Sequence, residues 1–170
     1  LIDNDAADGL TGRFLALMSH GGKPLKHIIR PLGDRSFVSP GMIDVTDIED
    51  RPDLELFGPL LQIIRVADFD SAVREANATR FGLCASLIGG SSDDYEQFWA
   101  NSRAGIVNWN TTTHEVSQQG TFGGTGLSGN HRPGGYYAAD FCAFPVMSAE
   151  SDTPKGMIGI WLKSENYGQG

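Results

Sequence analysis

The chain has 170 residues, 40% of them apolar and 20% charged, with 22 glycines, which is typical of a loop-rich globular protein and not of a disordered one. Its net charge is −8 and it has no basic stripe, so we expect no nucleic acid partner, because counterion release needs clustered cations. No apolar run reaches membrane-spanning length and no signal peptide is recognisable, so we expect a cytoplasmic protein without a membrane partner.

The first fifty residues predict a small helix and extended segments. The chain opens at Leu1 in a polar stretch, which fits a sequence entered partway as well as a processed terminus. Residues 14–18 favour a small helix, and residues 27–29 and 37–45 favour extended chain.

The stretch from residue 60 to residue 109 predicts alternating strands and helices. The apolar, β-branched run at 60–66 is too short for a helix, and further apolar runs at 84–88 and 105–109 predict two more strands. Asp68 and Ser91 open the intervening stretches with the chemistry of helix N-caps. Strand, helix, strand, helix, strand with short connections is typical of an open parallel βαβαβ sheet with right-handed crossovers. We therefore predict an α/β fold.

The chain after residue 109 predicts a loop and an edge strand. Residues 110–135 are glycine-rich and have almost no apolar periodicity, and long loops in compact domains are usually functional or disordered. Residues 143–147 favour another strand, which Pro145 restricts to an edge or to a position outside the ladder.

Gly124, Gly126 and Gly129 satisfy the spacing G-x-G-x-x-G of dinucleotide-binding loops. Such a loop needs a strand before it and a helix at its end, so that the pyrophosphate meets the helix N–H groups. Neither flank fits, so we favour a structural loop whose glycines serve positive φ angles or a close backbone approach.

The sequence gives little support for a metal site or for a reactive cysteine. The four histidines have no partner at metal-ligand spacing and the two cysteines lie far apart, so we expect no metal site. Cys84 and Cys142 both lie in apolar segments, which favours inert buried thiols over reactive ones. From the residues alone, no autonomous active site is recognisable.

Four motifs nevertheless occur in a fixed order. They are ELFGP at 55–59, ANATRFGL at 76–83, GIVN at 105–108, and FGG at 122–124 followed by SG at 128–129. In this order and spacing they resemble the aldehyde dehydrogenase superfamily over residues 38–148. The runs at 130–133 and 136–143 are similar in particular to the succinylglutamate-semialdehyde dehydrogenases of arginine catabolism.

The resemblance implies an oxidation in which a cysteine thiolate attacks the aldehyde, hydride leaves to NAD+ and a glutamate-activated water hydrolyses the thioester. It places that cysteine, that glutamate and most of the cofactor domain before residue 1, so it implies no catalytic residue in this chain and no activity of the chain alone. It divides the chain into a catalytic-domain portion at 1–142, an oligomerisation strand at 143–150 and a divergent tail at 151–170.

Site residues also follow from the resemblance. Glu55 matches the glutamate that binds the nicotinamide ribose hydroxyls, and Phe57 the aromatic residue near the nicotinamide. Phe122 matches the substrate-pocket end of the glycine loop, with a loop anchor as the alternative. His131 and Arg132 suit a carboxylate of a succinylated substrate, with a structural contact as the alternative.

Cofactor, partners and function are expectations of the same kind. NAD is the expected cofactor, with NADP as the alternative, and the expected partners are a small aldehyde and further copies of the chain. Thr121 stands where the family commonly has proline, so oxidation of another semialdehyde is one alternative. A non-catalytic assembly or binding module derived from the family is the other.

Overall fold

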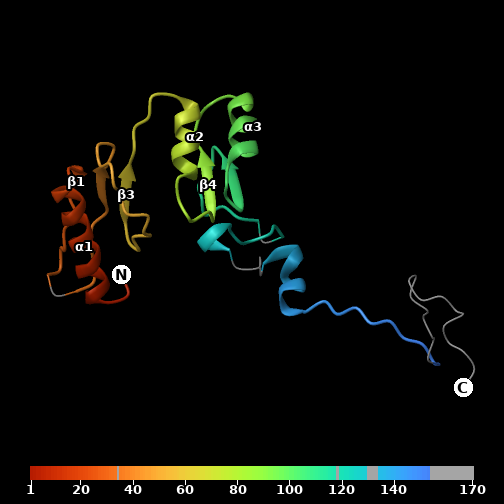
Figure 1. Cartoon of the computed structure of the whole chain (residues 1–170). Helices are drawn as coiled ribbons and strands as arrows, with labels where there is room; N and C mark the ends of the chain where they lie inside the picture. The colour runs from red at the N-terminus through yellow and green to blue at the C-terminus, as the bar shows by residue number, and fades with distance from the viewer. Residues whose placement is uncertain (34, 118, 130–133, 154–170) are drawn as a thin grey trace, which may run out of the picture.

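The structure, a computed structural model, describes residues 1–33, 35–117, 119–129 and 134–153 (Figure 1). Two lobes lie side by side, joined by the connection that follows residue 63, and the later residues trail away from the second lobe. The first lobe contains α1 (Asn4–Ser19), β1 (Lys23–Lys26), β2 (Gly41–Asp44) and β3 (Leu60–Ile63). The second contains α2 (Phe69–Asn77), β4 (Cys84–Leu87), α3 (Ser92–Asn101) and β5 (Ile106–Trp109).

The first lobe holds the main hydrophobic core. Helix α1 begins where the Asp3 carboxylate accepts a hydrogen bond from the Ala6 amide at 2.8 Å, which caps its free N–H groups. Strand β2 pairs antiparallel with β1 and parallel with β3. The core cluster joins one face of the helix to the sheet and the connections around it, through Leu10, Phe14, Leu17, Ile28, Ile43, Val45 and Ile48.

The second lobe is covered less completely. Asp68 caps α2 and Ser91 caps α3, the latter in a capping box with Asp94. Strands β4 and β5 pair in parallel, and all their residues are only half-buried. In the helices of this lobe only Val73 and Phe98 are buried.

The predicted α/β class with parallel strands is confirmed, and the three strands and two helices expected between residues 60 and 109 are present. The expectation that these three strands share one sheet is wrong for the described residues, because β3 takes β2 as its neighbour and β4 pairs with β5 alone. Helix α1 is also longer than predicted. It has 16 residues, since Ala7 and Leu10 extend the buried stripe of Phe14 and Leu17 toward the cap at Asp3.

After β5 the described chain is loop with single 3-10 turns at Gly126–Ser128, Gly135–Ala138 and Asp140–Cys142. Residues 143–153 run away from both lobes (Figure 1) and form no strand within the described part of this chain. Pairing of the 143–150 segment therefore stays a prediction, and residues 154–170 of the predicted tail lie outside the described residues. In the part of the chain that the structure describes, no helix is long and apolar enough to cross a membrane.

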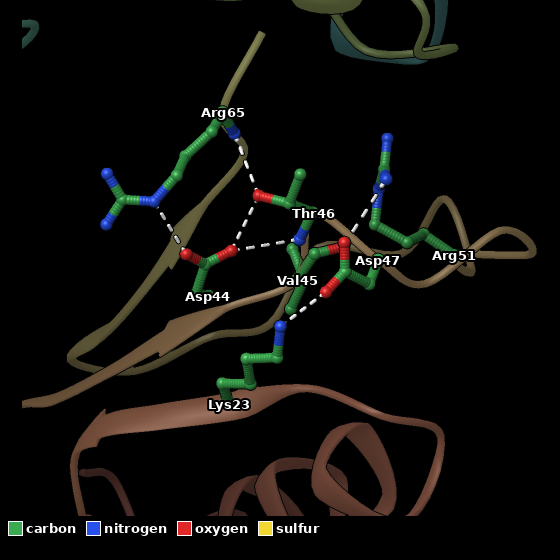
Figure 2. A network of polar contacts seen from close by, with 7 residues as sticks. All are labelled: Lys23, Asp44, Val45, Thr46, Asp47, Arg51 and Arg65. Atoms are coloured by element: carbon green, nitrogen blue, oxygen red, sulfur yellow. Dashed lines mark hydrogen bonds and ion pairs between the residues drawn. The ribbon is translucent and has the colours of Figure 1, made fainter.

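A polar network closes the carboxyl ends of β2 and β3 (Figure 2). One Asp44 carboxylate oxygen accepts from Arg65 Nε at 2.8 Å, and the other accepts from the Thr46 hydroxyl at 2.6 Å and the Thr46 amide at 3.1 Å. The Thr46 hydroxyl in turn accepts from the Arg65 amide at 2.9 Å. The hydrogen bond from the Thr46 hydroxyl, followed by that from Arg65, lowers the pKa of Asp44 to about 2. The network fixes where the chain leaves β2 toward residues 45–59.

Candidate functional site

Glu55 and Phe57 lie on the connection between β2 and β3, which is held at both ends. At its start, Arg51 donates to the Glu75 carboxylate of α2 and, at 3.1 Å, to the Ile48 carbonyl. At its end, Gly58 has a φ of +150°, and a Cβ there would lie 2.4 Å from Leu10 Cδ2. A φ in this range favours glycine, and without a Cβ at Gly58 the ELFGP motif lies against Leu10 of α1.

The Glu55 side chain is exposed and borders two open pockets. One, of about 360 Å³, lies between this connection and the segments around residues 76–85 and 102–104. The other, of about 240 Å³, lies against α1 and is also lined by Phe57. Phe57 is 78% exposed. No hydrogen bond among the described residues engages the Glu55 carboxylate, so its oxygens are free to accept from ligand hydroxyls.

Asp53, two residues before Glu55, is bound to the loop that follows α2. Its carboxylate accepts from the Thr79 hydroxyl at 2.6 Å, from the Arg80 amide at 2.8 Å and from Arg80 Nε at 3.1 Å. The Asp53 carbonyl accepts from Arg80 Nη2 at 3.1 Å. These donors, the Thr79 hydroxyl first, lower the pKa of Asp53.

The glycine loop, which begins at Phe122 and contains Gly124, Gly126 and Gly129, packs against the loop that follows α2. The Gly82 carbonyl accepts from the amides of Gly105 at 3.1 Å and Thr125 at 2.9 Å. A Cβ on Gly105 would lie 1.8 Å from the Gly123 carbonyl oxygen, and Gly126 has a φ of +57°. Within the motif, Gly126 has the positive φ expected of a structural loop, and the residues Gly126–Ser128 form a 3-10 turn in place of the helix that a dinucleotide-binding loop needs.

The predicted substrate residues are placed only in part. Phe122 is 40% exposed and forms an isolated antiparallel bridge with Gly134, which fits the loop-anchor alternative as well as the substrate role. Neither pocket bordered by Glu55 is lined by Phe122. His131 and Arg132 lie outside the described residues.

The two thiols differ from each other. Cys84 is half-buried in β4, and burial raises the pKa of its thiol, which disfavours the nucleophilic thiolate. The expectation of a buried thiol at Cys142 is wrong, because Cys142 is exposed. It ends the last 3-10 turn, Asp140–Cys142. Within the described residues no group of three or more His, Cys, Asp or Glu side chains could hold a metal ion.

The contact of Asp53 with Thr79 and Arg80 was not found from the sequence. Both partners stand in the ANATRFGL motif, but they lie 26 and 27 positions from Asp53. A single sequence has no local signal for a contact between segments that are separated by β3 and α2.

The chain matches the model of the aldehyde dehydrogenase family over residues 4–144. It is 61% identical over 165 residues to an N-succinylglutamate 5-semialdehyde dehydrogenase of Novosphingobium aromaticivorans, which covers 97% of this chain and 35% of the relative. A protein of the same name from Ectopseudomonas mendocina is 52% identical over 136 residues, 80% of this chain and 28% of the relative. The chain thus spans about a third of the length of the relatives that it matches.

Solved structures show the same fold. Aldehyde dehydrogenase 21 of Physcomitrella patens, in complex with the reaction product succinate, superposes with a TM-score of 0.73 at 26% identity, over 83% of this chain and 29% of that structure. Succinate-semialdehyde dehydrogenase of Burkholderia pseudomallei gives 0.72 at 27% identity over the same shares.

Proposed function

The chain belongs to the aldehyde dehydrogenase family, and from this premise we propose that it forms the carboxyl-terminal part of the catalytic domain of an NAD-dependent enzyme. The proposed reaction is oxidation of N-succinylglutamate 5-semialdehyde to the carboxylate. The observation that carries this proposal is the identity of 61% over 165 residues to the relative of that name. The activity belongs to the whole enzyme, because the chain spans 35% of that relative.

Glu55 and Phe57 are the residues proposed to hold the nicotinamide end of the cofactor. An exposed carboxylate without a partner among the described residues suits two ribose hydroxyls, which donate to it in charge-assisted hydrogen bonds. Phe57 is 78% exposed and lines, together with Glu55, the pocket of about 240 Å³ against α1. It supplies an apolar surface for a flat ring. The dinucleotide, when bound, supplies the hydride acceptor.

The nucleophile is proposed to come from the part of the family's length that these 170 residues do not span. Burial raises the pKa of the Cys84 thiol, and Cys142 is exposed and lines neither pocket bordered by Glu55. The chain alone should therefore oxidise no aldehyde. An activity of the isolated chain that disappears with Cys84→Ala or Cys142→Ala would contradict this assignment.

The test is to measure NADH formation by the full-length enzyme with N-succinylglutamate 5-semialdehyde as the substrate. An unsuccinylated semialdehyde of similar length serves as the comparison substrate. We expect kcat/KM to be at least about tenfold higher for the succinylated compound, because a site built to bind the succinyl group leaves its own polar groups unpaired when the comparison substrate is bound. Equal kcat/KM values for the two compounds would contradict the proposed substrate. A lack of NADH formation with any aldehyde would contradict the proposed dehydrogenase activity.

A further inference from the structure

Asp53 joins two segments that are distant in the sequence. Its carboxylate and carbonyl take four hydrogen bonds from Thr79 and Arg80, which are 26 and 27 positions away. The Asp53 side chain is 32% exposed, so solvent weakens these bonds without removing them. The neighbouring Glu55 carboxylate has no hydrogen bond to another described residue, so its position depends on the backbone that Asp53 holds.

Residues 79–82, which include the partners of Asp53, also form hydrogen bonds with the glycine loop. The Arg80 carbonyl accepts from the Leu127 amide at 2.8 Å, and the Gly82 carbonyl accepts from the Thr125 amide at 2.9 Å. The Gly82 amide donates to the Ser128 hydroxyl at 3.2 Å. Residues 79–82 therefore form a bridge with Asp53 on one side and the glycine loop, which begins at Phe122, on the other.

The two aspartates that cap helices of the second lobe have a different use. Asp68 and Asp94 accept bonds from residues three positions away and close the first turns of α2 and α3. Such contacts stabilise one helix end. Those of Asp53 span two loops, so they determine how the segment of Glu55 lies relative to the glycine loop.

We propose that Asp53 is a positioning residue, which fixes the Glu55 carboxylate relative to the glycine loop through Thr79 and Arg80. Asp53 thereby aligns the residue that holds the nicotinamide ribose with the loop that leads to the substrate end at Phe122. This inference rests on the proposed function for the roles of Glu55 and Phe122, whereas the contacts of Asp53 do not depend on it.

The test is Asp53→Asn in the full-length enzyme, with Asp68→Asn as the matched control. Asparagine keeps the shape, but it replaces one acceptor oxygen with a donor and removes the charge. We expect KM for NAD+ to rise about tenfold, as for the loss of one charge-assisted hydrogen bond, with kcat and the aldehyde KM changed less than about twofold. Hydrogen exchange at the Arg80 and Leu127 amides should become faster. Asp68→Asn, in which asparagine can still cap α2, should leave KM for NAD+ and both exchange rates unchanged.

An active enzyme in which Asp53→Asn lowers the melting temperature but changes neither KM for NAD+ nor exchange at Leu127 would overturn the inference. If Asp53→Asn does not fold, Thr79→Val removes one of the four bonds and should give the same pattern with a smaller rise in KM. An unaltered full-length protein that oxidises no aldehyde would overturn the proposed function instead. In that case, unchanged exchange at Leu127 in Asp53→Asn would overturn the coupling as well.

Discussion

Glu55 and Asp53 lie two residues apart on one connection, yet their carboxylates have different environments. The Asp53 carboxylate accepts three hydrogen bonds from protein donors, whereas the Glu55 side chain is exposed beside two open pockets. A carboxylate that is filled by protein donors serves structure, and one that is left open beside a pocket is available to a ligand. This contrast supports the proposed division of labour between the two residues.

Glu55→Gln in the full-length enzyme tests whether Glu55 binds the nicotinamide ribose. The change preserves the shape of the side chain but weakens hydrogen bonds to ribose hydroxyls, each of which contributes roughly 1.5–3 kcal/mol. We expect KM for NAD+ to rise at least about tenfold, with a smaller effect on the aldehyde KM. Glu96→Gln, an exposed glutamate of α3, is the control and should change neither value. An unchanged NAD+ dependence with normal turnover would exclude this role for Glu55.

Asp44 makes the first lobe sensitive to acid. Its pKa in the folded protein is about 2, below the ordinary value of about 3.9 in an unfolded chain. Its contribution to stability is therefore fully present above about pH 4 and is lost as the pH falls toward 2. Asp44→Asn should lower the stability at neutral pH and reduce its fall between pH 4 and 2, as measured by urea unfolding. Asp50→Asn, at an exposed position of the same lobe, should leave the profile unchanged.

At the scale of elements, the glycine loop depends on contacts in which there is no room for a side chain. Gly105→Ala would place a Cβ 1.8 Å from the Gly123 carbonyl oxygen, so the loop must move away from β5. We expect a loss of roughly 1–3 kcal/mol in unfolding free energy, as for other overpacked sites. Gly12→Ala on α1, where no atom lies within 4 Å of the new Cβ, should instead add about 0.5–1 kcal/mol through helix propensity. Equal effects of the two changes in thermal unfolding would contradict this account of the loop.

At the scale of the whole molecule, the two lobes differ in how well they are buried. The core cluster belongs to the first lobe, with Phe14, Ile43 and Val45 almost completely buried, while β4 and β5 are half-buried throughout. Amide exchange in the isolated chain should therefore be slower in β2 than in β4 or β5, because local stability follows buried apolar contact. In the full-length enzyme we expect this difference to shrink. Equal protection of both lobes in the isolated chain would show that the second lobe needs no further cover.

The segment that follows Cys142 should join copies of the chain. Phe144, Val146 and Met147 are 89%, 82% and 95% exposed, and an extended apolar segment without a strand partner is a template for pairing with another chain. We expect light scattering at micromolar concentration to give a homodimer or a larger assembly. Phe144→Asp should shift the mass toward the monomer, while Glu150→Gln in the same segment should not. A mass that stays near 18.3 kDa across dilution of the unaltered chain would contradict the assembly.

Features that depend on residues close together in the chain could be predicted from the sequence. Asp68 and Ser91 predicted the starts of α2 and α3 because a cap acts on amides within one turn, and the four ordered motifs indicated the family. The tertiary structure decided which strands are neighbours, since β3 could pair with β2 or with β4 by its composition alone. It also decided that Asp53 meets Arg80, and that Cys142 is exposed despite its apolar segment. Such contacts depend on where distant segments meet in space, and the pattern of a single chain does not contain that information.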